Sequence, residues 1–70
     1  MQNQYETKGH STAGMPFFGD AKRAAAEASL NGFAWVYSAT EGGGWLIAIG
    51  DDLDARPNNA IIEFKDGEEQ

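Results

Sequence analysis

The stretch that decides the fold runs from Phe33 to Ile49 and reads FAWVYSATEGGGWLIAI. Apolar and aromatic side chains alternate on both sides of a glycine run, which is typical of two β-strands joined by a turn. We therefore predict strands at 33–39 and 45–49 that pair as an antiparallel hairpin, with residues 41–44 in the turn.

The length of the hairpin loop decides which side chains share a face, because successive strand residues point to opposite sides of a sheet. An even number of loop residues divides the aromatic residues between the two faces, and an odd number collects them on one. We favour the odd loop, since bulky strand side chains complement a helix of small residues. The residues that then share a face are Phe33, Trp35, Tyr37, Trp45, Ile47 and Ile49.

One helix is predicted before the hairpin, at residues 20–31, because this segment is rich in alanine and other strong helix formers. Asp20 is the expected N-cap, and Gly32 is expected to end the helix in the left-handed conformation. Small side chains recur at helical spacing and form the face that approaches the sheet. They are Ala21, Ala24, Ala25 and Ala28.

Two further strands complete the expected sheet, one at 60–65 and a short one at 4–8. We expect 66–70 to be a solvated tail, and both this tail and residues 1–3 to be flexible. Strands that follow a helix indicate the α+β class. The prediction is a single domain over 1–70, with one helix packed on a three- to four-stranded antiparallel sheet in β-α-β-β-β order.

Composition excludes several kinds of function. The 70 residues carry a net charge of −6, which argues against direct binding to nucleic acid or an anionic membrane and favours a basic protein partner. The absence of cysteine excludes disulfides and thiolate metal sites. The first residues lack the pattern of a signal peptide, and the longest apolar run, 45–49, is too short to span a membrane. We therefore expect a cytoplasmic protein.

The acidic excess lies entirely in the second part of the chain. Residues 1–40 hold three acidic and three basic side chains, whereas residues 41–70 hold eight acidic and two basic ones. Surface carboxylates can imitate the phosphates of DNA for a protein whose groove is lined with lysine and arginine. The alternative is that they only keep a small protein soluble. The candidate partner-binding residues are Glu41, Asp51, Asp52, Asp54 and Glu63.

A partial calcium-loop pattern begins at Asp52. Asp54 and Glu63 stand at the right spacing from Asp52, but Arg56 replaces an acidic ligand and Pro57 replaces the glycine of the sharp turn. We predict no dedicated metal site, and a weak cation site in this loop stays open.

No sequence pattern indicates catalysis or a cofactor. The glycines at 42–44 lack the lysine and hydroxyl residue of a phosphate-binding loop, and a strand follows them. His10 is the single histidine, its neighbour is Ser11, and no third residue can be assigned to orient them. We expect no enzyme activity and no cofactor.

The layout of residues 20–65 resembles the small anti-CRISPR proteins of phages and mobile elements, especially inhibitors of multi-subunit Cascade-type systems. The similarity is one of architecture: an Ala-Lys-Arg-Ala-Ala-Ala helix at 21–26, an Asn31-Gly32 stop, and strands rich in Trp and Phe. It implies a stoichiometric inhibitor in the host cytoplasm that binds a surveillance complex, in several cases by mimicking DNA. The group shares no signature motif, so no functional residue is transferred.

The sequence thus leaves two hypotheses. The first is a protein inhibitor that fills a basic nucleic-acid groove with its carboxylates, supported by aromatic or aliphatic contacts. The second is a small homodimeric interaction module that pairs through an edge strand or an open sheet face. The residues expected on that open face are Ala34, Val36, Ser38, Leu46, Ala48 and Ile61.

Overall fold

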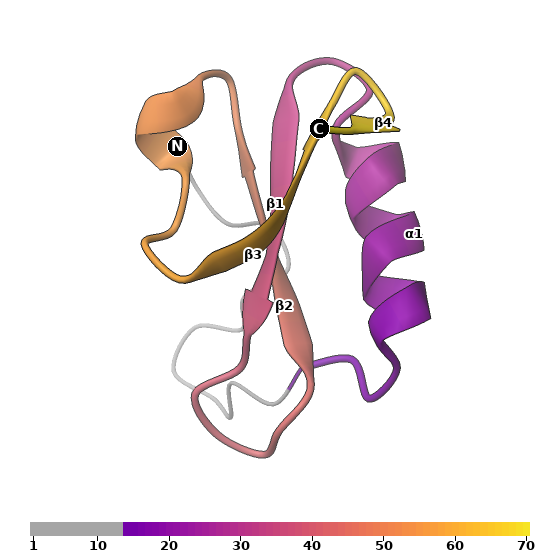
Figure 1. Cartoon of the computed structure of the whole chain (residues 1–70), viewed down its shortest axis with the longest axis vertical. Helices are drawn as coiled ribbons and strands as arrows, with labels where there is room; N and C mark the ends of the chain where they lie inside the picture. Colours follow the sequence, from indigo (N-terminus) through magenta and orange to yellow (C-terminus); the bar gives the residue numbers. More distant parts are fainter. Residues whose placement is uncertain (1–13) are drawn as a thin grey trace.

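The predicted hairpin forms two neighbouring strands, one central and one at the edge, of a four-stranded antiparallel sheet (Figure 1). The computed structural model describes residues 14–70, so the strand expected at 4–8 lies outside the described residues. The sheet order is β2-β1-β3-β4. The α+β class is therefore confirmed. Its elements are α1 (Phe18–Ala28), β1 (Phe33–Ser38), β2 (Trp45–Gly50), the 3-10 turn η1 (Leu53–Ala55), β3 (Ala60–Lys65) and β4 (Glu68–Glu69).

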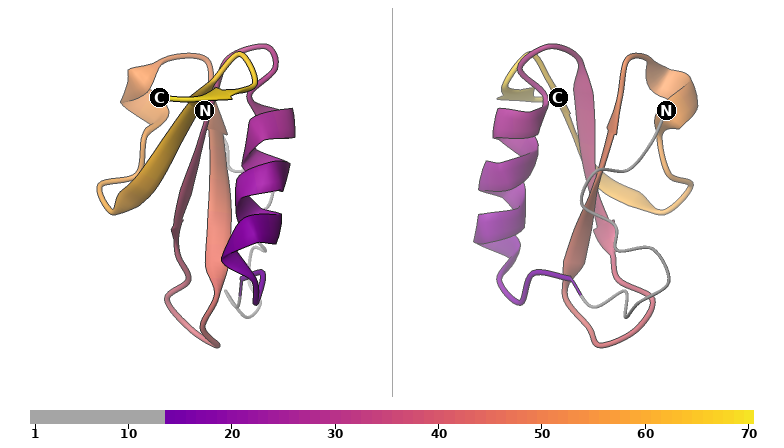
Figure 2. Two further views of the ribbon diagram at one scale, coloured as in Figure 1. Left: turned by 45° about the vertical axis from the view of Figure 1, so that its right-hand side comes forward. Right: turned by 180° about the vertical axis from the view of Figure 1, so that it is seen from behind.

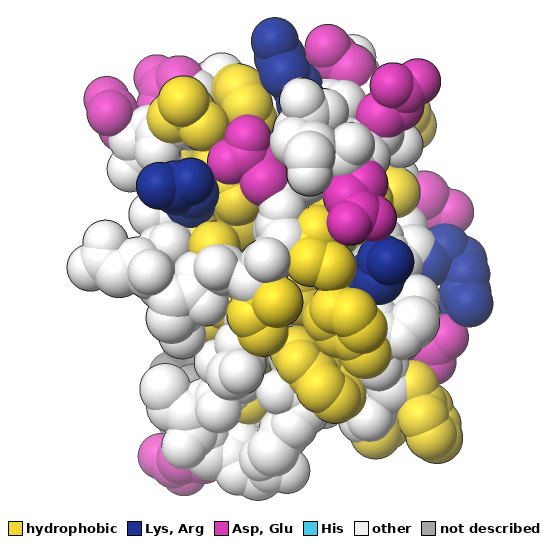
Figure 3. Space-filling view, in the orientation of Figure 1, with side chains coloured by type: hydrophobic (Ala, Val, Ile, Leu, Met, Phe, Trp, Pro, Cys, Tyr) yellow, Lys and Arg dark blue, Asp and Glu magenta, His cyan; other side chains and the backbone are white. Residues whose placement is uncertain are grey.

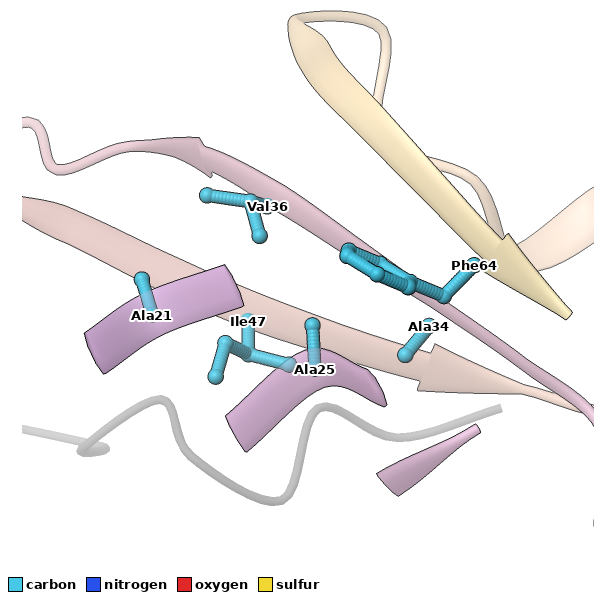
Figure 4. Close-up of a cluster of buried hydrophobic side chains, with 6 residues drawn as sticks. All are labelled: Ala21, Ala25, Ala34, Val36, Ile47 and Phe64. Carbon is cyan, nitrogen blue, oxygen red and sulfur yellow. The ribbon is translucent and has the colours of Figure 1, made fainter. Parts of the chain in front are cut away.

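The helix covers one side of the sheet, and η1 lies on the other side (Figure 2). Ala21 and Ala25 are completely buried at the contact between α1 and the sheet, as the small-residue face predicts. Because alanine has no atoms beyond Cβ, the helix can lie close to the strands, and the larger side chains come from the sheet. Figure 4 shows the sheet residues in the same cluster as the two alanines, which are Ala34 and the larger Val36, Ile47 and Phe64.

The helix begins two residues earlier than Asp20, which is not its N-cap. Phe17 takes the capping position with an extended backbone, and no side chain caps the helix. Asp20 lies in the first turn and forms an ion pair with Arg23 at 3.0 Å. The earlier start places the Phe18 ring 5.3 Å from the Trp45 ring, centroid to centroid. This aromatic contact favours an earlier helix start, which the local capping preference does not predict.

The helix ends at Ala28 rather than Asn31, and Gly32 is not in the left-handed conformation. The buried Ser29 follows the last turn, and its hydroxyl donates to the Ala26 carbonyl at 2.9 Å. A glycine is still needed at position 32, because a Cβ there would lie 2.8 Å from the Gly50 carbonyl oxygen. Glycine is therefore needed at this position because the backbone of Gly50 passes close to it, and not because the position requires a left-handed conformation.

The hairpin loop contains an even number of residues, so the prediction of an odd number was wrong. Ser38 pairs with Trp45, which leaves six residues, 39–44, between the strands. The aromatic residues are consequently divided: Trp45 faces the helix, and Trp35 faces the opposite side. Trp35 has a polar partner on that side, described below, and the smaller β1 side chains face the helix.

The expected open sheet face does not exist. Ala34 and Val36 are buried beneath the helix, and Leu46 and Ala48 are buried on the other side. The core on that other side consists of Trp35, Tyr37, Leu46 and Ala48, with Phe33, Ala39, Ala55 and Ala60 packed around it. Each face of the sheet therefore has its own apolar core.

The last residues are not simply a tail, because Glu68–Glu69 form β4 beside Phe64 and Lys65 of β3. Asp66 (φ 54°) and Gly67 (φ 87°) make the turn between the two strands. The Gly67 amide also donates to the Ser29 hydroxyl at 2.8 Å, which ties this turn to the end of α1.

Candidate interaction surface

The five predicted partner-binding acids do not form one continuous line. Glu41 lies in the loop between β1 and β2, at one end of the sheet. Asp51, Asp52 and Asp54 follow the end of β2 and are all exposed at the opposite end. Glu63 lies within β3, and its side chain is only 25% exposed. The structure thus brings together three of the five residues.

Glu63 is engaged inside the protein. Its Oε1 accepts a hydrogen bond of 2.9 Å from the indole N–H of Trp35, a side chain with no solvent exposure. The same oxygen lies 3.7 Å from the Arg56 guanidinium. A buried indole N–H needs an acceptor, so the structural role of Glu63 accounts for an acidic residue at this position.

The three aspartates sit on a locally ordered backbone. Asp52 accepts a hydrogen bond of 3.0 Å from the Asp54 amide through its side chain and so caps η1. Leu53, between them, is 56% exposed, although leucine is an apolar side chain. Carboxylates on both sides of an exposed leucine give this turn a charged border around an apolar centre, which is a common arrangement at protein interfaces.

Two acids that we did not select join this end of the sheet. Phe33 pairs with Gly50 on one side and Lys65 on the other, so β2 and β3 end side by side with the start of β1. The turn after β3 therefore brings Asp66 and Glu68 to the same end. An Asp-Gly pair is a recognisable turn signal and could have revealed this hairpin. We call the following residues the acidic end: Asp51, Asp52, Asp54, Asp66 and Glu68.

No carboxylate of the acidic end is in an ion pair among residues 14–70. The basic residues of this region are engaged elsewhere: Lys22 with Glu69 at 3.4 Å, Arg23 with Asp20, and Arg56 with Glu63. Lys65 lies over the Phe33 ring, 5.4 Å from its centroid. In addition, α1 has no basic residue in its last turn to offset its negative end. Figure 3 shows acidic side chains along the upper part of the molecule, on both sides of one basic side chain.

The described residues hold no group of three or more His, Cys, Asp or Glu side chains arranged to bind a metal ion. No helix within residues 14–70 is long and apolar enough to cross a membrane. His10 and Ser11 lie outside the described residues. No family model matches the chain, and comparisons with curated proteins and with solved structures found no match.

Proposed function

We propose that this chain is a non-enzymatic protein inhibitor that binds the basic surface of a nucleic-acid-binding protein through its acidic end. The observation that carries the proposal is a set of five carboxylates that form no ion pair within residues 14–70, three of which adjoin the exposed Leu53. Solubility alone accounts for the charges, but it does not account for an exposed apolar side chain among the three aspartates.

The number of carboxylates sets how far they can imitate DNA. The acidic end spreads from η1 to β4, along the intermediate axis of the molecule, which measures 23 Å. Duplex DNA carries about one phosphate charge per 1.7 Å of axis, or about 14 over such a length. Five carboxylates supply about a third of that density. Charge therefore guides the encounter and sets the orientation, and Leu53 adds the apolar contact that slows dissociation.

This proposal revises the set of partner-binding residues. Asp51, Asp52 and Asp54 keep that role, and Asp66 and Glu68 join them. Glu63 supports Trp35 and acts on binding only through the fold. The sequence resemblance implies a Cascade-type surveillance complex as the target, in which a positively charged channel accommodates the DNA.

The direct test is inhibition of target-DNA binding by a purified Cascade-type complex, measured by gel shift at two salt concentrations. The double variant Asp51→Asn with Asp54→Asn should inhibit about 10- to 100-fold less well, because two charges leave the interface. High salt should weaken inhibition by the unmodified chain.

A matched control is Asp20→Asn with Glu41→Gln, which removes the same charge from exposed positions at the other end of the molecule, in the first turn of α1 and in the loop between β1 and β2. It should inhibit like the unmodified chain. If the two double variants lose inhibition equally, net charge rather than the acidic end is responsible. If the unmodified chain does not compete with DNA at all, the proposed target is wrong.

A further inference from the structure

Two neighbouring turns each carry an exposed amide or carboxyl side chain directly before a glycine. Asn31–Gly32 lies between α1 and β1, and Asp66–Gly67 lies between β3 and β4 (Figure 1). The turns are in contact, because the Asp66 N–H donates to the Gly32 carbonyl at 3.1 Å. Glycine has no Cβ, so its nitrogen can approach the preceding side chain with little steric hindrance. Both pairs are therefore suited to an intramolecular reaction of the backbone.

This reaction turns the side chain into a cyclic imide. The glycine nitrogen loses its proton and forms a bond to the side-chain Cγ, and the leaving group is ammonia at Asn31 and water at Asp66. Water then opens the ring at either carbonyl, which gives an aspartate or an isoaspartate, whose backbone runs through Cβ and Cγ. Asn31 is thereby deamidated and gains a negative charge, whereas Asp66 is isomerised at constant mass.

Ser29 holds the nitrogen of both glycines in the folded protein. The Gly32 N–H donates to the Ser29 backbone carbonyl at 3.0 Å, and the Gly67 N–H donates to the Ser29 hydroxyl at 2.8 Å. Ser29 is completely buried, and its hydroxyl donates to the Ala26 carbonyl at 2.9 Å. A hydrogen-bonded N–H reacts only after its bond opens, as in amide hydrogen exchange. Each reaction therefore requires a bond to Ser29 to open first.

We infer that Asn31 is a deamidation site and Asp66 an isomerisation site, and that Ser29 protects both in the folded chain. The two bonds differ in kind, because Gly67 depends on the Ser29 side chain and Gly32 on the Ser29 backbone. A substitution of Ser29 therefore separates them. The inference does not depend on the function proposed for the acidic end, because it concerns only the chemistry of the two turns.

Both reactions change the acidic end. Deamidation of Asn31 adds a carboxylate in the turn next to Asp66. Isoaspartate at position 66 inserts a carbon atom into the backbone of a two-residue turn that sets the register of β3 with Glu68–Glu69. Glu69 is then displaced from Lys22, whose ammonium lies 3.4 Å from its carboxylate. Protection by Ser29 thus maintains both the charge and the shape of this surface.

Amide hydrogen exchange of the full chain, followed by NMR, tests the protection directly. In the unmodified chain the Gly32 and Gly67 amides should exchange at least about 10-fold more slowly than in the urea-unfolded chain. Ser29→Ala removes the hydroxyl and keeps the backbone carbonyl. It should speed up exchange at Gly67 about 10-fold and leave Gly32 within about 3-fold. Equal acceleration at the two amides refutes protection by the hydroxyl.

The reactions themselves are measured by peptide mapping and an isoaspartate assay after incubation of the folded chain below its unfolding temperature. Both sites should react at least about 10-fold more slowly than in the urea-unfolded chain, because only the opened fraction reacts. Ser29→Ala should raise isoaspartate formation at Asp66 about 10-fold, with a much smaller effect on deamidation of Asn31.

The matched control is Glu63→Ala, which breaks one partly buried hydrogen bond, that to Trp35, and leaves Ser29 in place. It acts only through global unfolding and should raise the rates at Asn31 and Asp66 by the same factor. The inference is refuted if Glu63→Ala favours the reaction at Asp66 as strongly as Ser29→Ala does. It is also refuted if the folded, unmodified chain reacts at either site as fast as the urea-unfolded chain.

Discussion

The hydrogen bond between Trp35 and Glu63 gives the sharpest test of the packing described above. Trp35 is fully buried, and its indole N–H has the Glu63 carboxylate as acceptor at 2.9 Å. Glu63→Ala leaves this donor without a partner, which costs about 1–3 kcal/mol. Glu63→Gln keeps a carbonyl oxygen in place, so the expected loss is about 0.5 kcal/mol.

The contribution of Arg56 separates the hydrogen bond from the ion pair. The Arg56 guanidinium lies 3.7 Å from Glu63, and its side chain is 58% exposed. Exposed ion pairs contribute about 0–1 kcal/mol, so Arg56→Ala should cost about 0.5 kcal/mol at most. A small domain of this length is stabilised by about 4–10 kcal/mol in total, so the loss from Glu63→Ala is readily measured.

Urea unfolding followed by circular dichroism measures these differences. In a Trp35→Phe background the N–H donor is absent, and Glu63→Ala should cost about 1–2 kcal/mol less than it does in the unmodified chain. The reasoning fails if Glu63→Ala and Glu63→Gln are equally destabilising. It also fails if Arg56→Ala costs as much as Glu63→Ala, because the ion pair would then be the main term.

Three further sites give predictions that the same unfolding assay can check. Ser29→Ala removes a buried hydroxyl that bonds both the end of α1 and the β3–β4 turn, and should cost about 1–3 kcal/mol; equal loss from Ser38→Ala, an exposed site, would contradict this. Gly32→Ala should cost about 1–3 kcal/mol, because its Cβ would lie 2.8 Å from the Gly50 carbonyl oxygen. Gly19→Ala meets no atom within 4 Å in the helix and should stabilise by about 0.5–1 kcal/mol, so a loss there would show that the helix start is misplaced.

Sequence patterns predicted the elements whose signals are local. Alternating apolar residues on both sides of Gly42–Gly44 placed β1 and β2, and the alanine-rich segment placed α1 to within a few residues. Short-range periodicity carries this information because the side chains of one element share its geometry. The start of α1 was missed because Phe18 meets Trp45, a residue far along the chain that capping preference does not take into account.

The sequence did not reveal which hairpin side chains lie on which face of the sheet, for a related reason. Loop parity depends on whether Ser38 or Ala39 is the last paired residue, and both side chains are small. The choice is decided by Trp35, whose N–H requires an acceptor, and that acceptor is Glu63, 28 residues later. Only the pairing of β1 with β3 makes this acceptor available, so the aromatic pattern of the hairpin alone was misleading.

The same strand pairing explains why the candidate site was only partly predicted. The pairing of β1 with β3 places Glu63 opposite Trp35, so its carboxylate is partly buried and bonded to the indole N–H. It also aligns the end of β3 with the end of β2, so that the Asp66–Gly67 turn carries two more carboxylates to the acidic end. The charged surface thus depends on the topology of the sheet. The aspartates at 51–54 are neighbours in the sequence, whereas Asp66 and Glu68 reach the same end because β3 pairs with β1. An account based on charge count alone selects Glu63, whose side chain is partly buried and bonded to Trp35, and misses Asp66, which is exposed.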